Sequence, residues 1–213
     1  MDNQNNLNDA EVIEERKNPS PAENAPSAAH SILEYMEMFV FAVIAVLLVF
    51  TFAFRLCQVQ GGSMLNTLKN GERVITTNIF YTPKQNDIIV FHQTSDTNPT
   101  LNEPIIKRVI ATEGQTVKID FRDENDMTIW VDGVEFEDAD AYLDVSRNHI
   151  YPQHHFNRMT GIFEATVPEG HVFVLGDNRD NSNDSRSQAI GFVDERRILG
   201  KVLFRIKPFT SFN

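Results

Sequence analysis

The chain has 213 residues, a length that suits one domain of moderate size or a small core with an extended insertion, and that excludes a large multidomain protein. Its formal net charge is -11, and it contains no dense stripe of Lys and Arg. A nucleic-acid-binding surface needs such a stripe, so we expect no nucleic-acid partner.

Residues 1–37 form an acidic tail with eight Asp or Glu residues and two basic residues, Arg16 and Lys17. Asn, Glu, Ala, Ser and Pro dominate residues 1–30, and large apolar side chains are few there. Such a composition cannot bury enough apolar surface to offset the entropy that is lost on ordering. We therefore predict that this tail is disordered.

An uncharged apolar run follows the tail. Met38 to Phe54 reads "MFVFAVIAVLLVFTFAF", and with Leu56 and Cys57 the run becomes long enough to cross a hydrocarbon core. A cleavable signal sequence would start nearer the N-terminus, with a basic segment before it and a small-residue cleavage site after it. A buried core helix would show a polar stripe. The run has neither pattern, so we predict a single transmembrane anchor over residues 38–57.

The charges beside this anchor do not give a simple orientation. Residues 18–37 contain no Lys or Arg, whereas Arg55, Lys69 and Arg73 lie at or beyond the end of the run. The positive-inside rule would therefore place the tail outside the cell, but the rule loses force when a whole domain is translocated. The orientation is left to the family resemblance described below.

After the anchor the sequence is typical of an antiparallel β protein. Short runs such as "RVITTNIF", "DIIVFHQ", "IIKRVIA" and "HVFVL" are rich in β-branched residues and are separated by turn residues, with no long helical period. Asp132 and Gly133 predict a tight hairpin, because a type I′ turn needs positive φ at both central residues. The acidic stretch from Asp120 to Phe163 resembles an insertion, and we expect an inserted β subdomain over about residues 112–170.

The chain offers little for metal or disulfide chemistry. Cys57 is the only cysteine, and no Cys or His spacing matches a zinc or iron–sulfur site. His154 and His155 are adjacent, so their side chains would diverge on a strand, and no further ligand completes a set. We interpret this pair as part of a polar loop.

The segment "GGSMLNTL", residues 61–68, is a candidate nucleophile loop. Two glycines before Ser63 allow a sharp turn that would expose the hydroxyl and its backbone N–H to an approaching carbonyl. A flexible linker that ends in serine would have the same composition. The segment alone therefore does not decide between the two interpretations.

The strand-like segment "IIKRVI" contains a candidate general base. Lys107 lies among β-branched neighbours, and removal from water would lower its pKa and make it a usable base near neutral pH. The alternative is a lysine on an edge strand, with its stem packed and its ammonium group in water.

A third segment, "GDNRDNSNDSR" at residues 176–186, contains no apolar side chain. It could be a surface loop stabilised by side-chain to backbone hydrogen bonds, or a rigid polar scaffold. Asp184 and Arg186 could form a charge-assisted pair, and Ser182 could hydrogen-bond a neighbouring lysine.

The order of these segments resembles the successive sequence boxes of the type I signal peptidases, from about Glu34 to Phe209. The last box is the most specific of them. The resemblance implies that Ser63 is the nucleophile, that Lys107 is the general base and that Ser182 orients the lysine. It further implies supporting roles for Gly176, Asp177, Asp184 and Arg186, and substrate-positioning roles for Gly61 and Met64.

The resemblance also implies the activity and the setting of the protein. It predicts a membrane-anchored serine endopeptidase that removes signal peptides from secretory preproteins with small residues at positions -3 and -1, and that needs no cofactor. The tail would be cytoplasmic, and residues 58–213 would form an extracytoplasmic peptidase domain. The implied fold is mainly β, with an antiparallel catalytic core and the inserted subdomain, preceded by one transmembrane helix that lies in the lipid bilayer.

Two positions depart from the family pattern. Asn66 replaces the usual proline of the serine box, and Asn86 replaces the usual glycine before "DIIVF". Neither position supplies a proton or a nucleophile, so we expect the chemistry to survive. Asn66 does loosen the backbone beside the nucleophile, which places substrate positioning in doubt.

Two rival functions remain open from the sequence. A self-cleaving repressor-type protease also uses a Ser/Lys pair, but it would need a DNA-binding module where this chain has an apolar run. A catalytically silent, membrane-anchored binding paralogue of the same fold is the rival of another class, and Asn66 is its best support. Cleavage of a peptide with an Ala-x-Ala site would separate an enzyme from the silent paralogue.

Overall fold

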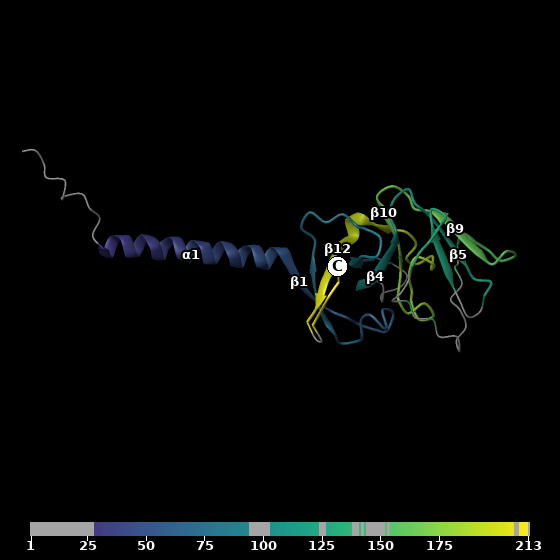
Figure 1. Ribbon diagram of the computed structural model, residues 1–213, viewed down its shortest axis with the longest axis horizontal. Coiled ribbons are helices and arrows are strands. Elements are labelled where there is room, and N and C mark those ends of the chain that lie inside the picture. The colour runs from purple at the N-terminus through teal and green to yellow at the C-terminus, as the bar shows by residue number, and fades with distance from the viewer. Residues whose placement is uncertain are drawn as a thin grey trace, which may run out of the picture. The chain divides into compact units, whose positions relative to one another are not determined.

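The computed structural model describes residues 28–93, 103–123, 127–137, 141, 143, 152, 154–206 and 209–212 (Figure 1). The chain divides into two units, residues 1–47 and residues 48–213. Of the tail predicted to be disordered, residues 1–27 lie outside the described residues. Residues 28–37, which complete that range, are helical.

Helix α1 spans Ala28–Ala53, and its apolar side chains, such as Phe41, Leu47 and Phe50, are exposed. Within the described part of the chain, it is the one helix long and apolar enough to cross a membrane. Many of its residues are β-branched or aromatic and have only moderate helix propensity in water. In a bilayer they still form a helix, because only internal hydrogen bonding satisfies the backbone there.

The helix limits differ from the predicted anchor at residues 38–57. The helix begins at Ala28, and it ends at Ala53 because the next residues form strand β1 (Phe54–Gln58). Strand β1 pairs with strand β2 (Arg73–Thr77) in antiparallel register from Phe54 opposite Thr77 to Gln58 opposite Arg73. The backbone of residues 54–58 therefore obtains its hydrogen bonds from a neighbouring strand, which local composition could not reveal.

The larger sheet has eight strands, and all of its paired neighbours are antiparallel. Its order is β1-β2-β12-β3-β4-β10-β11, and β13 pairs with β12. The strands not yet located are β3 (Ile88–His92), β4 (Pro104–Ala111), β10 (His171–Leu175), β11 (Val193–Asp194), β12 (Ile198–Arg205) and β13 (Thr210–Ser211). Strand β4 thus lies between β3 and β10, inside the sheet.

The smaller sheet has five strands in the order β7-β6-β5-β9-β8. Asp132 and Gly133 both have positive φ at the turn between β6 and β7, as the hairpin prediction required. All five strands fall between residues 116 and 166, within the stretch expected as an insertion. They are β5 (Thr116–Asp120), β6 (Thr128–Val131), β7 (Val134–Glu135), β8 (Phe156–Asn157) and β9 (Ile162–Thr166).

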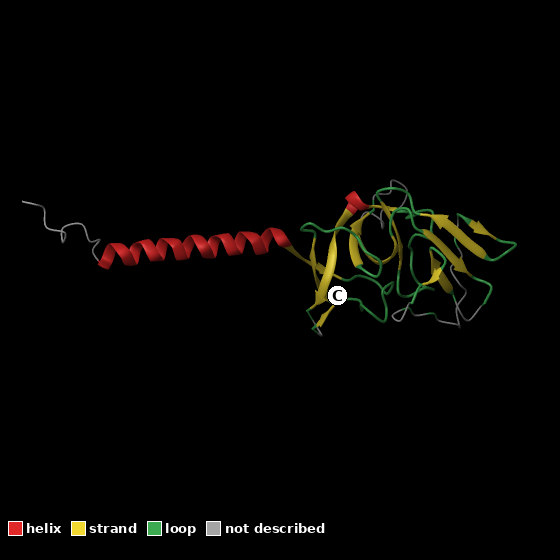
Figure 2. Cartoon of the chain, turned by 45° about the horizontal axis from the view of Figure 1, so that its top comes forward, coloured by secondary structure: helices red, strands yellow, loops and turns green. Residues whose placement is uncertain are grey.

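Apart from α1 and the short 3-10 turn Glu195–Arg197, the regular elements of the described residues are strands (Figure 2). This confirms the predicted fold class, which is mainly β with antiparallel sheets after one apolar helix.

The central strands of the larger sheet are buried on both faces. Along β3, Ile89 and Phe91 belong to one core cluster while Ile88 and Val90 belong to another. Successive side chains of a strand point to opposite faces, so two separate clusters are the expected result. This double burial explains the nearly continuous apolar runs around residues 88–91 and 105–111, and it places any polar residue of β4 in an environment with little water.

Candidate functional site

Ser63 lies on a loop, residues 59–72, that joins β1 to β2. Backbone hydrogen bonds close the base of the loop, from Val59 N to Glu72 O at 2.8 Å and from Gly71 N to Val59 O at 2.9 Å. Met64 is 2% exposed and lies beneath the turn in a core cluster, while Ser63 is partly exposed. The buried methionine therefore fixes the turn, and the serine hydroxyl stays open to a substrate.

Lys107 comes from β4 and reaches the serine. Its Nζ donates hydrogen bonds to Ser63 Oγ at 2.7 Å and to the carbonyl oxygen of Ile106 at 3.0 Å. The side chain is 3% exposed, so it is not a lysine on a solvated edge. The two residues are 44 positions apart in the sequence, and the fold brings them into direct contact.

Burial in this site lowers the pKa of Lys107 to about 8, because the ammonium form loses its hydration. The negative charges of Asp184 and Asp177 oppose this change, and the positive charge of Arg186 adds to it. At about pH 8 roughly half of the lysine is then neutral and can accept a proton. A buried amine that is partly neutral next to a hydroxyl is a suitable arrangement for nucleophilic catalysis.

The polar segment after β10 holds the backbone of the serine turn. Asn178 donates from its backbone N to Ser63 O at 3.0 Å and from its Nδ2 to Gly62 O at 3.0 Å. The sequence analysis did not single out Asn178. It belongs to the same polar box as the predicted residues, but its side chain has no acid–base chemistry that would mark it.

Gly176 lies where no side chain fits. A Cβ at this position would lie 2.2 Å from Ser182 Oγ and 2.5 Å from the carbonyl oxygen of Ser63. Its backbone N donates to Asp184 Oδ2 at 3.1 Å. The glycine therefore lets the polar segment pass directly against the backbone of Ser63.

Asp184 and Arg186 form the predicted charge-assisted pair. Arg186 donates from Nε to Asp184 Oδ1 and from Nη2 to Asp184 Oδ2, both at 2.9 Å, and both side chains are fully buried. Burial alone would raise the pKa of Asp184, but the charge and the hydrogen bonds of Arg186 outweigh it and leave that pKa below its usual value. Arg186 also donates to Arg179 O at 2.7 Å, so it links the end of the polar segment to its middle.

Ser182 lies beside Gly176 but is not joined to Lys107. Its Oγ is buried and makes no hydrogen bond of good geometry with the described residues. The hydroxyl is nevertheless near enough to Asp184 to help lower the pKa of that carboxyl. The predicted role of Ser182 in orienting the lysine stays a prediction.

Asp177 forms a second buried ion pair, with Arg108. The sequence analysis named Asp177 but not its arginine partner. Arg108 donates to its carboxylate from Nε and Nη2, each at 2.8 Å, and the hydroxyl of Thr67 donates to the same carboxylate. Arg108 follows Lys107 on β4, so its side chain leaves the opposite face of the strand. Sequence could place the arginine on that face but could not identify its carboxylate partner 69 residues away.

Gly61 shapes the loop just before Ser63. Its φ is 80°, which favours glycine, and its backbone N donates to Asn70 Oδ1 at 3.0 Å. That N–H is therefore already used within the loop, so it does not point to a substrate carbonyl.

The departure at Asn86 has a structural explanation. Its φ is 72°, in the left-handed region that glycine adopts freely and that asparagine tolerates better than most residues.

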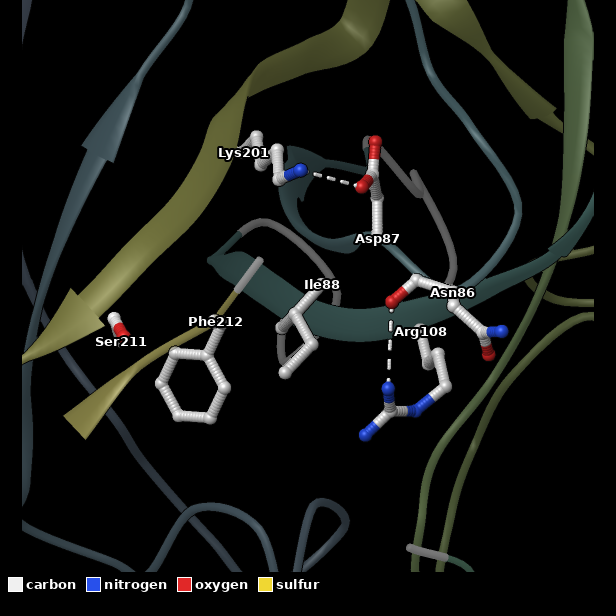
Figure 3. A pocket seen from close by; sticks show the side chains of 7 residues that line it. All are labelled: Asn86, Asp87, Ile88, Arg108, Lys201, Ser211 and Phe212. Atoms are coloured by element: carbon white, nitrogen blue, oxygen red, sulfur yellow. Dashed lines mark hydrogen bonds and ion pairs between the residues drawn. The ribbon is translucent and has the colours of Figure 1, made fainter. Parts of the chain in front are cut away.

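Asn86 lines a cavity of about 220 Å³ with Asp87, Arg108 and Lys201, together with Ile88, Ser211 and Phe212 (Figure 3). The charged groups there are satisfied locally, since Lys201 contacts Asp87 at 2.7 Å and Arg108 donates to the Asn86 carbonyl at 3.3 Å.

Metal binding has no ready site in the described part of the chain, where no group of three or more His, Cys, Asp or Glu side chains could hold an ion. His154 and His155 instead pack edge to face with each other and against Phe163.

Comparison with known proteins points to one family over most of the chain. Residues 32–207 match the family described as signal peptidase, peptidase S26. Signal peptidase I T of Bacillus subtilis (strain 168) is 34% identical over 201 residues, which cover 92% of this chain and 96% of that protein. Signal peptidase IB of Staphylococcus aureus (strain COL) is 31% identical over 195 residues, which cover 85% of this chain and 92% of that protein.

A solved structure is also similar in sequence. The crystal structure of a signal peptidase I from Enterococcus faecalis V583 is 33% identical and covers 57% of this chain and 97% of its own, with a TM-score of 0.38.

Proposed function

The chain belongs to the signal peptidase family, peptidase S26, whose members are serine endopeptidases, and on this premise we propose that it removes signal peptides with Ser63 as nucleophile and Lys107 as general base. The observation that carries the proposal is the 2.7 Å hydrogen bond between Lys107 Nζ and Ser63 Oγ, made by a lysine that is almost fully buried. Preproteins are the substrates of this family, and the apolar helix anchors the protein in the membrane.

The mechanism begins with proton transfer. Neutral Lys107 accepts the proton of the Ser63 hydroxyl as Oγ attacks the scissile carbonyl carbon. The backbone N–H of Ser63 donates to the oxyanion that forms. When the tetrahedral intermediate collapses, the C–N bond breaks and the Lys107 ammonium returns its proton to the leaving amine, so an acyl-enzyme remains.

Lys107 then acts a second time. It accepts a proton from water, the hydroxide attacks the acyl carbon, and collapse of the second intermediate breaks the bond to Ser63 Oγ. The proton held by Lys107 returns to Ser63. Each turnover consumes one water molecule, and Ser63 and Lys107 carry out every bond-making and proton-transfer step in this scheme.

The polar segment has a supporting role in this proposal. Asn178 and Gly176 keep the backbone of Ser63 in place, and the buried pair of Asp184 and Arg186 keeps the segment itself rigid. We further propose that small residues at -3 and -1 are selected because shallow apolar pockets exclude larger side chains by overpacking.

The test of this function is cleavage of a peptide that contains an Ala-x-Ala site by the detergent-solubilised full chain. A matched peptide with Leu in place of both alanines should be cut far more slowly. The rate should rise with pH along a limb governed by the Lys107 pKa of about 8, because only the neutral amine activates the serine. Absence of cleavage at every pH would instead favour the silent binding paralogue.

We also propose that the tail is cytoplasmic and that the peptidase domain is extracytoplasmic, since preproteins are cut after export. Protease added to cells stripped of their wall or outer membrane should digest the region after Cys57 and leave the first 30 residues of the tail intact. The reverse pattern would contradict this topology, and detergent-lysed cells, in which both regions are accessible, provide the control.

A further inference from the structure

The turn that carries Ser63 has two halves that are held by different contacts. Asn178 fixes the first half through the carbonyl oxygens of Gly62 and Ser63, each at 3.0 Å. Within the turn, the backbone N of Leu68 donates to Met64 O at 2.7 Å. The position of Ser63 Oγ therefore also depends on what holds the second half, residues 65–68.

Thr67 holds that second half from two directions. Its hydroxyl donates to Asp177 Oδ2, on the carboxylate that Arg108 also binds through Nε and Nη2. Its carbonyl oxygen accepts a hydrogen bond from Arg205 Nη1 at 3.0 Å. One residue thus joins the serine turn both to the polar segment after β10 and to strand β12.

The contact from Arg205 is itself well supported. Its Nη1 also lies 3.0 Å from Glu72 Oε2, and that carboxylate oxygen accepts the backbone N–H of Lys69 at 3.0 Å. The side chains of Arg205 and Glu72 are only 14% and 12% exposed, so solvent ions screen their attraction weakly. The donor that reaches Thr67 is therefore held in place at the base of the same loop.

Asn66, the residue before Thr67, makes the serine turn more dependent on the two Thr67 contacts. Proline at position 66 would fix φ, whereas Asn66 is exposed and leaves φ free. Lys107 does not move with the turn, because it lies on β4 and its Nζ also donates to Ile106 O. The distance from Ser63 Oγ to Lys107 Nζ is therefore set from the side of the turn.

We propose that Thr67 is the positioning residue of the nucleophile turn, whose two anchors keep Ser63 Oγ within reach of Lys107 Nζ and replace the stiffness that proline would supply at position 66. The inference rests on the proposed roles of Ser63 and Lys107. Loss of the hydroxyl frees one end of the turn, so proton transfer slows while the substrate-binding surface stays in place.

Thr67→Val tests this directly, because valine keeps the shape of the side chain and removes the donor. With the Ala-x-Ala peptide, kcat should fall about 10- to 100-fold and KM should stay within about twofold, since misplacement by about 1 Å costs roughly 100-fold in rate. Thr67→Ser keeps the hydroxyl and should stay within about threefold of the wild-type kcat. Thr116→Val is the matched control, because this threonine pairs with Thr166 on the smaller sheet and should leave kcat unchanged.

A second set of variants separates positioning from a merely structural role. Asn66→Pro should change kcat little in the wild type but should recover about tenfold in the Thr67→Val background, because restriction of φ restores the lost stiffness. Melting curves at the assay pH establish that each kcat refers to folded protein. If Thr67→Val is unfolded, Thr67→Cys takes its place, with a weaker donor and an intermediate kcat.

Three results would overturn the inference. They are a normal kcat in Thr67→Val, equal losses in Thr67→Val and Thr67→Ser, and no recovery with proline. Activity of Ser63→Ala would reject the proposed function itself, so the two failures are distinguishable.

Discussion

Lys107→Met is expected to abolish peptide cleavage and to raise the melting temperature at neutral pH. Methionine fills a similar volume but cannot accept the Ser63 proton. It also removes a buried amine whose pKa falls from 10.5 to about 8 on folding, a difference that costs about 3 kcal/mol of stability wherever the amine is protonated. The loss of two hydrogen bonds, to Ser63 and Ile106, offsets part of this gain.

The pH dependence of this stability difference has a definite sign. Between pH 8 and 10.5 the unfolded lysine binds more protons than the folded one, so the lysine-dependent part of the stability rises with pH in that window. The advantage of the methionine variant should therefore be full below pH 8 and shrink through the window. Melting curves of both proteins from pH 6 to 10 measure it. The matched control is Lys69→Met, which replaces an exposed lysine on the loop that carries Ser63 and should change neither the cleavage rate nor the melting temperature.

Ser63→Ala is expected to lower the rate of peptide cleavage by several orders of magnitude while leaving the fold intact. Among the described residues, the Ser63 hydroxyl is the one that Lys107 Nζ is shown to hydrogen-bond, and an alanine removes one oxygen atom from a partly exposed site. Loss of a nucleophile that acts as a unit with its base removes the whole covalent route. The rate of product formation by chromatography and the melting temperature together measure the effect.

Cys57→Ser is the companion variant for the serine experiment. Cys57 is a free cysteine shortly before Ser63, and its thiol is a possible alternative nucleophile. Its Sγ lies 3.9 Å from Thr76 Oγ1, which joins Cys57 on β1 to Thr76 on β2. Its replacement should leave cleavage unchanged. Full activity in Ser63→Ala, or loss of activity in Cys57→Ser, would reject the assignment of the nucleophile.

Local composition was enough to predict the strands that build the catalytic core. The runs around Ile88–His92 and Pro104–Ala111 combine β-branched residues with flanking turn residues, and both are strands. The ends of the apolar helix were not predictable in the same way. Leu56 and Cys57 are apolar and extend the run, but their backbone pairs with strand β2, which begins only at Arg73, beyond the whole serine loop.

The residues of the candidate site also differ in whether local sequence could identify them. Ser63 and Lys107 could be identified because each has reactive chemistry within a recognisable segment. Asn178, Arg108 and Thr67 act through contacts with distant backbone or with a buried carboxylate, and nothing in their local sequence names those partners. Positioning contacts of this kind depend on the tertiary approach of the serine turn to the segment after β10.

The direct passage from helix α1 into strand β1 leaves little chain between the apolar helix and Ser63. The helix ends at Ala53 and the strand begins at Phe54, so the short segment 54–63 leads from the end of the helix to Ser63. Even when fully extended, a segment of that length reaches only about 35 Å. With α1 as the proposed anchor and Ser63 as the proposed nucleophile, a preprotein would have to present its scissile bond within that distance of the point where α1 leaves the bilayer.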